Sequence, residues 1–93
     1  MNNPTICQAI DGMFLLQITY DNKIRLVEPH AYGVDKAGDE LLRAWQQTPS
    51  PDDWRTFRVD RMTAVAITKI RFSGPHKDYA RNDKAMTKIY CQL

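Results

Sequence analysis

The sequence predicts a mainly β domain: a small barrel of about five antiparallel strands with a short helix at each end. Segments that alternate between apolar and polar residues recur along the chain and are separated by turn sequences, which is typical of short antiparallel strands. One of these segments, Ile24 to Val34, contains Pro29 and Gly33, and both residues favour a sharply bent strand. A chain of 93 residues can fill one modest core, so we expect a single domain.

The first elements follow from periodicity and turn chemistry. Pro4 to Gly12 carries apolar residues at helical spacing and predicts a short helix. Met13 to Tyr20 alternates cleanly between apolar and polar residues and predicts a strand. Asp21-Asn22-Lys23 is typical of a hairpin turn, so Ile24 to Val34 is expected to return beside that strand.

The middle of the chain is predicted to be extended as well. Glu40 to Gln47 fits a helix on propensity, but its position between two hairpins favours a strand. Thr48 to Asp53 contains two prolines and two acidic residues and predicts a loop. Trp54 to Phe72 then reads as two strands that meet at a bulge or tight corner near Asp60-Arg61.

The last segment, Lys84 to Leu93, places its apolar residues at helical spacing and predicts a C-terminal helix. The domain is therefore expected to consist of a helix over 1–12, a barrel over 13–72 and a C-terminal tail and helix over 76–93. Two roles stay open for the apolar stripe of this helix. It either forms an isologous homodimer or caps the open end of its own barrel.

The composition excludes several classes of protein. The net charge of +2 is mildly basic, so an anion site must come from local clustering of charge. The two cysteines, Cys7 and Cys91, have no metal-type spacing, and we expect no metal ion and no cofactor. No apolar run approaches the ~18 residues of a membrane span. We therefore expect a cytoplasmic protein with reduced thiols and no membrane contact.

Arginine is the main candidate for anion binding, because its planar guanidinium suits phosphate. Four arginines of different predicted segments are expected to converge on one groove of a closed barrel: Arg25, Arg43, Arg58 and Arg61. The alternative is that they are scattered ion-pair partners of Glu28, Glu40 and Asp60. Asp60 lies between two arginines and is expected to hold Arg58 or Arg61 in place rather than to act as a catalytic acid.

Three further candidates carry rings. His30 and Tyr32 are expected to share a strand face, where they could contact a base or a phosphate. The alternative is that His30 is a surface group at the strand end and Tyr32 a half-buried residue of the barrel. Trp45 is open to the same two interpretations, whereas Trp54 is predicted to anchor the core or a loop. His76 is expected to have no nearby partner and no role. No nucleophile–base pair, metal cluster or carboxylate pair stands out, so the sequence predicts a protein that is not an enzyme.

The order of these motifs resembles the WYL domain family over most of the chain. The resemblance rests on Ala9-Ile10, Tyr20, the Arg25 to Pro29 run, Leu42 and Ala44, and the Phe57 to Met62 run with Val65. The last run, Phe-Arg-Val-Asp-Arg-Met, is the most specific. The tripeptide that names the family falls at Glu40-Leu41-Leu42, where only the leucine is kept, and Trp45 is the nearby aromatic residue.

The resemblance implies an SH3-like, Sm-type barrel that senses nucleic acid or nucleotides in bacterial transcription regulation, DNA-damage response or phage defence. The family's usual helix-turn-helix does not fit into 93 residues, so we expect a stand-alone domain. Its expected partner is single-stranded DNA or RNA, or a nucleotide. The alternative function is a protein-interaction module that acts on a separately encoded partner.

Overall fold

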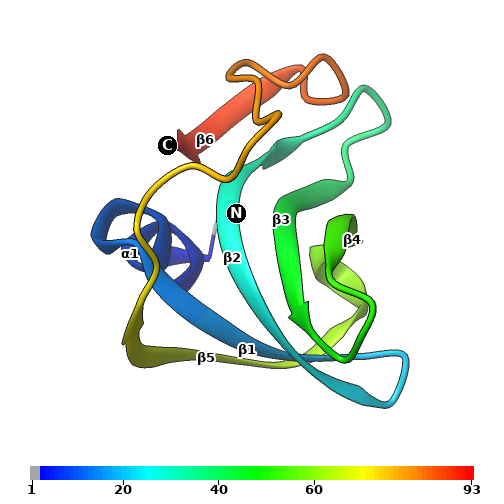
Figure 1. Ribbon diagram of the computed structural model, residues 1–93. Helices are drawn as coiled ribbons and strands as arrows, with labels where there is room; N and C mark the ends of the chain where they lie inside the picture. The colour runs from blue at the N-terminus through cyan, green and yellow to red at the C-terminus, as the bar shows by residue number, and fades with distance from the viewer. Residues whose placement is uncertain (1–2) are drawn as a thin grey trace.

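The structure is a computed structural model that describes residues 3–93 as one antiparallel sheet with one helix (Figure 1). The elements are α1 (Pro4–Gly12), β1 (Phe14–Tyr20), β2 (Lys23–Val34), β3 (Glu40–Thr48), β4 (Asp53–Arg58), the 3₁₀ turn η1 (Val59–Arg61), β5 (Met62–Arg71) and β6 (Lys88–Gln92). The strand order is β4-β3-β2-β1-β5, and β6 pairs with β2. The predicted small, mainly β, barrel-like fold is confirmed, and this strand order is compatible with an SH3-like barrel.

Helix α1 begins and ends where its terminal residues dictate. The Asn3 side chain accepts a hydrogen bond of 3.0 Å from the Thr5 amide, which caps the first turn. Met13 adopts a left-handed conformation with φ of 55° and ends the helix. The apolar face of α1 is buried against the inner faces of the strands, so the helix is part of the main core.

The long strand β2 organises the sheet, and Figure 1 shows it curving through the molecule. Its first half pairs with β1, from Lys23 to Val27, and its last residues pair with β6, from Ala31 to Val34. Strand β3 pairs with the opposite edge of β2. A bulge between Pro29 and Ala31 supplies part of the bend, as the sequence predicts.

The corner between β4 and β5 lies where the sequence predicts it. The 3₁₀ turn Val59–Arg61 separates the two strands, and Asp60 and Arg61 are both exposed. Phe57, just before the turn, is buried in the main core beside Leu42. Phe57 therefore points inward and Arg58 outward, as alternation along an extended strand requires.

The prediction of a C-terminal helix is wrong. Lys88–Gln92 forms strand β6, because β2 extends beyond β1 and leaves backbone groups at its edge that a strand can pair. Met86 and Ile89 pack with Ala31 and Leu41, while other apolar residues of this segment pack on the main core. The apolar stripe is covered by its own chain, which removes the argument for a dimer through this segment.

The expectation of reduced thiols is also wrong, because Cys7 of α1 and Cys91 of β6 form a disulfide. The two residues are 84 positions apart, and only the packing of α1 beside β6 brings them together. Within residues 3–93, no helix is both long and apolar enough to cross a membrane.

Candidate aromatic ligand site

Aromatic side chains gather on the outer face of β2, β3 and β4 and on the segment that follows β5. This aromatic cluster consists of His30, Trp45, Trp54, Phe72, His76 and Tyr79. The rings of Trp45 and His76 are stacked, with centroids 3.7 Å apart. The ring of Trp54 meets that of Trp45 edge-on at 5.6 Å and that of His30 at 4.8 Å. Such edge and stacked contacts fix the orientation of the rings.

The alternation of β3 and its pairing with β4 place both tryptophans on this face. Leu42 and Ala44 are buried in the main core, so Arg43 and Trp45 point outward. Trp54 lies directly opposite Trp45 in the β3–β4 pair. The segment between β5 and β6, yellow to orange in Figure 1, then crosses β2 and adds the remaining rings.

His30 is fully buried at the centre of the cluster, and both of its ring nitrogens have partners. Nδ1 lies 2.8 Å from the Glu28 carbonyl oxygen, which can only accept, so Nδ1 carries the proton. Nε2 accepts a hydrogen bond of 2.9 Å from the His76 amide. Burial lowers the pKa of His30 below its ordinary value of 6.5, which favours the neutral ring.

His76 contradicts the expectation that it has no partner. Its Nδ1 lies 3.5 Å from Glu28 Oε1, and its ring stacks on Trp45. The nearly buried Glu28 also accepts a hydrogen bond of 2.8 Å from Gln47 Nε2. Glu28 therefore positions His76 and does not pair with any of the candidate arginines.

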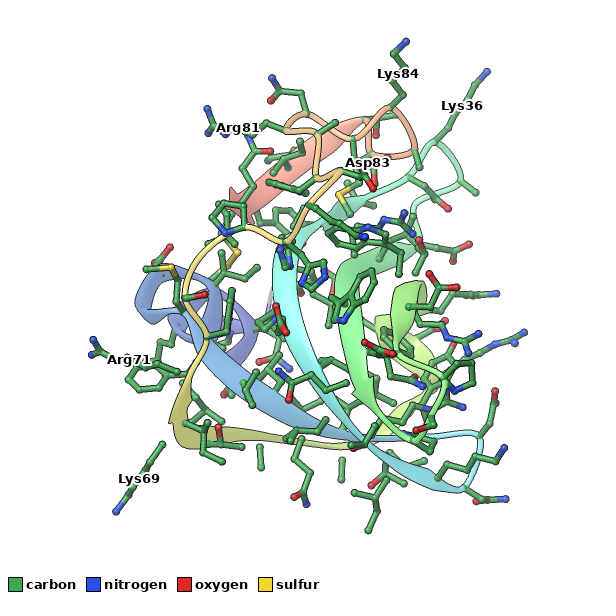
Figure 2. The ribbon with its side chains drawn as sticks, viewed as in Figure 1. Lys36, Lys69, Arg71, Arg81, Asp83 and Lys84 are labelled. Atoms are coloured by element: carbon green, nitrogen blue, oxygen red, sulfur yellow. A yellow bond between two sulfur atoms is a disulfide. The ribbon has the colours of Figure 1, made fainter. Side chains whose placement is uncertain are left out.

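A cavity of about 350 Å³ opens beside Trp54, and we refer to it as the Trp54 cavity. Its lining includes three basic side chains, Arg43, Arg81 and Lys84, together with Trp54, Tyr79 and Asp83. Figure 2 shows Arg81 and Lys84 extending outward from the loop before β6, with Asp83 turned back toward the strands. The cavity thus combines aromatic rings with a local excess of positive charge over Asp78 and Asp83.

Arg43 joins the aromatic cluster to this cavity. Its guanidinium lies over the Trp54 ring, 5.0 Å from the centroid, and its Nη1 donates a hydrogen bond of 3.1 Å to Thr56 Oγ1. These two contacts hold the guanidinium plane at the cavity without neutralising its charge. A ligand with an anionic group and a flat ring suits this pair, because the anion pairs with the guanidinium and the flat ring stacks beside the indole.

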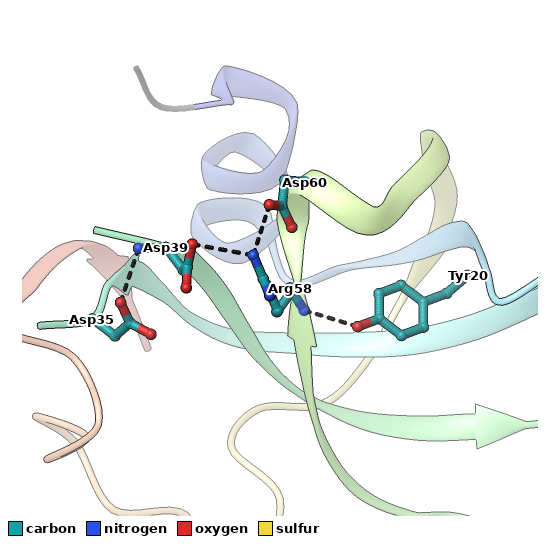
Figure 3. Close-up of polar contacts among 5 residues, drawn as sticks. All are labelled: Tyr20, Asp35, Asp39, Arg58 and Asp60. Atoms are coloured by element: carbon teal, nitrogen blue, oxygen red, sulfur yellow. Dashed lines mark hydrogen bonds and ion pairs between the residues drawn. The ribbon is translucent and has the colours of Figure 1, made fainter. Parts of the chain in front are cut away.

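Arg58, by contrast, is neutralised by two carboxylates. Its Nη2 lies 3.1 Å from Asp39 Oδ1 and 2.9 Å from Asp60 Oδ2 (Figure 3). The hydrogen bond that Arg58 donates to Asp60 and the charge of Asp39 raise the pKa of Arg58. The prediction that Asp60 holds an arginine in place is confirmed. The same pairing makes Arg58 a poor partner for a ligand anion.

The structure does not bring the four candidate arginines together. Arg25 lies over the Tyr20 and Phe57 rings, at 5.5 and 5.8 Å, and donates a hydrogen bond to Gln46 Oε1. Arg61 is exposed on η1, and only Arg43 lines the Trp54 cavity. The expected common groove is not found, because Arg25 and Arg58 are engaged by other side chains and Arg61 lies on η1 rather than on a strand.

Tyr32 and His30 do not share a face, contrary to expectation. The bulge after Pro29 turns His30 to the outer cluster, while Tyr32 lies in the main core. The Tyr32 hydroxyl donates to Glu40 Oε1 at 2.6 Å and accepts from the Asn3 amide at 2.7 Å. Burial raises the pKa of Tyr32, and the side chain has a packing role.

The sequence did not predict several residues of the site as ligand-binding residues. Trp54 was expected to be only an anchor, although pairing β3 with β4 across their loop would have placed it beside Trp45. Tyr79, Arg81 and Lys84 belong to a segment without strand or helix periodicity, so only the tertiary fold places them at the cavity.

Comparisons of the chain with protein-family models, curated proteins and solved structures gave no match.

Proposed function

We propose that this chain is a non-catalytic ligand-sensing domain that binds a nucleotide or single-stranded nucleic acid at the Trp54 cavity. The observation that carries the proposal is the Arg43 guanidinium over the Trp54 ring, 5.0 Å from its centroid, at a cavity with two further basic side chains. Of the sequence candidates, Arg43 and Trp45 remain in this proposal. Trp45 supports the neighbouring Trp54 and does not line the cavity.

The chemistry of the cavity fits the two parts of a nucleotide. Nucleobases stack on aromatic rings and on guanidinium planes, and phosphates pair with arginine and lysine. Trp54, Tyr79 and Arg43 offer the first kind of contact, and Arg43, Arg81 and Lys84 offer the second. The cavity volume of about 350 Å³ lies at the lower end of the range for small-molecule sites.

The resemblance to WYL domains implies that this binding has a regulatory role. In that interpretation, the bound nucleotide or strand reports on transcription, DNA damage or infection, and the domain passes the signal to a separately encoded protein. No reacting group is needed for such a role, which agrees with the prediction of a protein that is not an enzyme.

The test is a binding panel read by fluorescence anisotropy. Labelled nucleotides and short DNA and RNA oligonucleotides are titrated at several salt concentrations, because phosphate contacts make affinity fall as salt rises. We expect salt-sensitive binding that Arg43→Glu reduces by about tenfold or more. Lys69→Glu makes the same charge change far from Arg81 and Lys84 (Figure 2) and is the matched control. Absence of binding across the panel rejects the proposal.

A specific observation also supports the alternative of a protein-interaction module. Among residues 3–93, β5 pairs only with β1, so its other edge is open. Ile67 and Ile70 on this strand are 40% and 57% exposed, and Met62 to Thr68 carries no charge. Open, uncharged edges pair readily with a strand of another chain.

The two functions predict opposite responses to one variant. Ile67→Lys places a charge on the open strand and would prevent edge pairing, while the Trp54 cavity stays unchanged. Under the nucleotide proposal, this variant binds the panel as the natural chain does. Under the alternative, it loses self-association or partner capture, which light scattering and co-purification would detect.

A further inference from the structure

The end of β6 supports the loop that forms the Trp54 cavity. The Leu93 carbonyl oxygen accepts hydrogen bonds from Arg81 Nε at 2.9 Å and from the Tyr79 hydroxyl at 3.5 Å. The Gln92 side chain accepts from the Asn82 amide at 2.9 Å and donates to Asn82 Oδ1 at 3.0 Å. Three residues that line the cavity, Tyr79, Arg81 and Asn82, are therefore held by Gln92, the last residue of β6, and by Leu93, which follows it.

Strand β6 itself has limited backbone support. It is five residues long, pairs only with β2 among the described strands, and has a register shift opposite Tyr32 and Gly33. Its residues are half-buried or exposed. Beyond the ladder, the Leu93 amide donates to the His30 carbonyl oxygen at 2.9 Å. Short, partly exposed pairings of this kind open more easily than the centre of a sheet.

The covalent support of β6 is the disulfide between Cys91 and Cys7. Cys7 lies on α1, whose buried face belongs to the main core. The bond therefore ties the strand that holds the cavity loop to the helix that packs in the main core. Cys91 is adjacent in sequence to Gln92, so the tie lies one residue from the contacts to Asn82.

We propose that the thiol–disulfide state of Cys7 and Cys91 regulates the Trp54 cavity; the effect on ligand affinity rests on the proposed function. In the oxidised state, the cavity loop is held in the described shape. A dithiol reductant donates two electrons by thiol–disulfide exchange: its first thiolate breaks the Cys7–Cys91 bond, and its second thiol closes a disulfide within the reductant. Both cysteines are half-buried, which leaves them within reach of such a reagent.

Reduction removes the tie while it leaves the β1–β2–β3 core contacts in place. We expect β6 to open locally and the hydrogen bonds from Gln92 and Leu93 to the loop to break more often. The cavity then loses its fixed arrangement of Tyr79 and Arg81. A ligand that needs this arrangement must pay the cost of ordering the loop, so its affinity falls.

The experiment combines amide hydrogen exchange with binding, each with and without dithiothreitol. We expect reduction to speed exchange at the Asn82, Thr87 and Leu93 amides by about tenfold or more and to leave the amides of β1 better protected than these three, with any acceleration at β1 set by the lower global stability. The double variant Cys7→Ser/Cys91→Ser serves as control, and it should exchange fast at these amides and not respond to dithiothreitol. If this variant does not fold, the comparison of amide exchange in the natural chain with and without dithiothreitol is sufficient to test the inference.

The two arms separate failure of this inference from failure of the proposed function. Unchanged exchange at the three amides, or equal protection of these amides and those of β1 in the reduced chain, overturns the inference. Labelled adenosine triphosphate is the binding probe, and we expect its affinity to fall by about tenfold on reduction. If it binds neither state while the exchange responds as expected, the redox coupling of the cavity stands and the panel of oligonucleotides decides the proposed function.

Discussion

At the scale of single residues, the neutral state of His30 is the feature most easily tested. Its ring donates through Nδ1 and accepts through Nε2, and protonation of Nε2 would break the hydrogen bond from the His76 amide. Because burial lowers the pKa of His30 in the folded state, the unfolded chain binds more protons at acidic pH. The stabilisation is thus complete above about pH 6.5, the unfolded value, and is lost as the pH falls through the lower folded pKa.

We therefore predict that the free energy of unfolding decreases as the pH falls below about 6.5. Urea denaturation at a series of pH values measures this change. His30→Asn removes the titrating ring, and the pH dependence in this window should become weaker. An unchanged slope in His30→Asn would show that another group is responsible.

Arg58 supplies a second prediction at this scale. Because Asp39 and Asp60 already neutralise its guanidinium, Arg58→Gln should leave nucleotide affinity within about twofold of the natural chain. Arg43→Gln, which removes the same charge at the Trp54 cavity, should weaken binding. Anisotropy titrations of the two variants side by side make the comparison. Equal losses would indicate that the anion site is not confined to the cavity.

At the scale of elements, the antiparallel pairing of β2 with β6 depends on Gly33. A Cβ atom on Gly33 would lie 3.0 Å from Met86 Sδ and 3.1 Å from the Ile89 Cα, and closer still to the Lys88 carbonyl oxygen. Gly33→Ala therefore forces β6 away from β2, and we expect it to reduce the free energy of unfolding by about 1–3 kcal/mol. Urea denaturation measures the change. A variant as stable as the natural chain would contradict the close packing of β2 against β6 at Gly33.

Local periodicity and turn chemistry predicted α1 and four of the first five strands, and Glu40 to Gln47 was predicted as a strand from its position between two hairpins. The strand β6 was missed because Ala85, Met86, Ile89, Tyr90 and Leu93 fit helical spacing, whereas the open edge of β2 that selects a strand is a tertiary feature. The prediction that His30 and Tyr32 share a face was wrong for a related reason. A single bulge reverses which side chains point inward, and alternation alone does not reveal it.

At the scale of the whole molecule, the disulfide links the N-terminal helix to the last strand across 84 residues. Closing a loop of this length restricts the unfolded chain, so reduction should lower the free energy of unfolding by about 2–5 kcal/mol. Urea denaturation with and without dithiothreitol measures the loss, and Cys7→Ser/Cys91→Ser should match the reduced chain. Equal stability of the two redox states would contradict the prediction.

The candidate site itself is a property of the whole fold, because it joins β3 and β4 to the segment before β6. The sequence identified arginine and aromatic residues as the chemistry of the expected site, and two of its candidates, Arg43 and Trp45, contact Trp54. It did not show which arginines meet, because Arg25 and Arg58 are already engaged by neighbouring groups. Those contacts depend on strand register and on the corner at η1.

The central claim is that a nucleotide binds at the Trp54 cavity, and chemical-shift mapping of the ¹⁵N-labelled chain tests it most directly. On titration with the tightest-binding nucleotide or oligonucleotide of the panel, we predict shifts of the Trp54 indole signal and of the amides of Tyr79, Arg81 and Lys84. The amides near Arg61 and Lys69 should not move. Shifts centred on those two residues, or no shifts at all, would contradict the account.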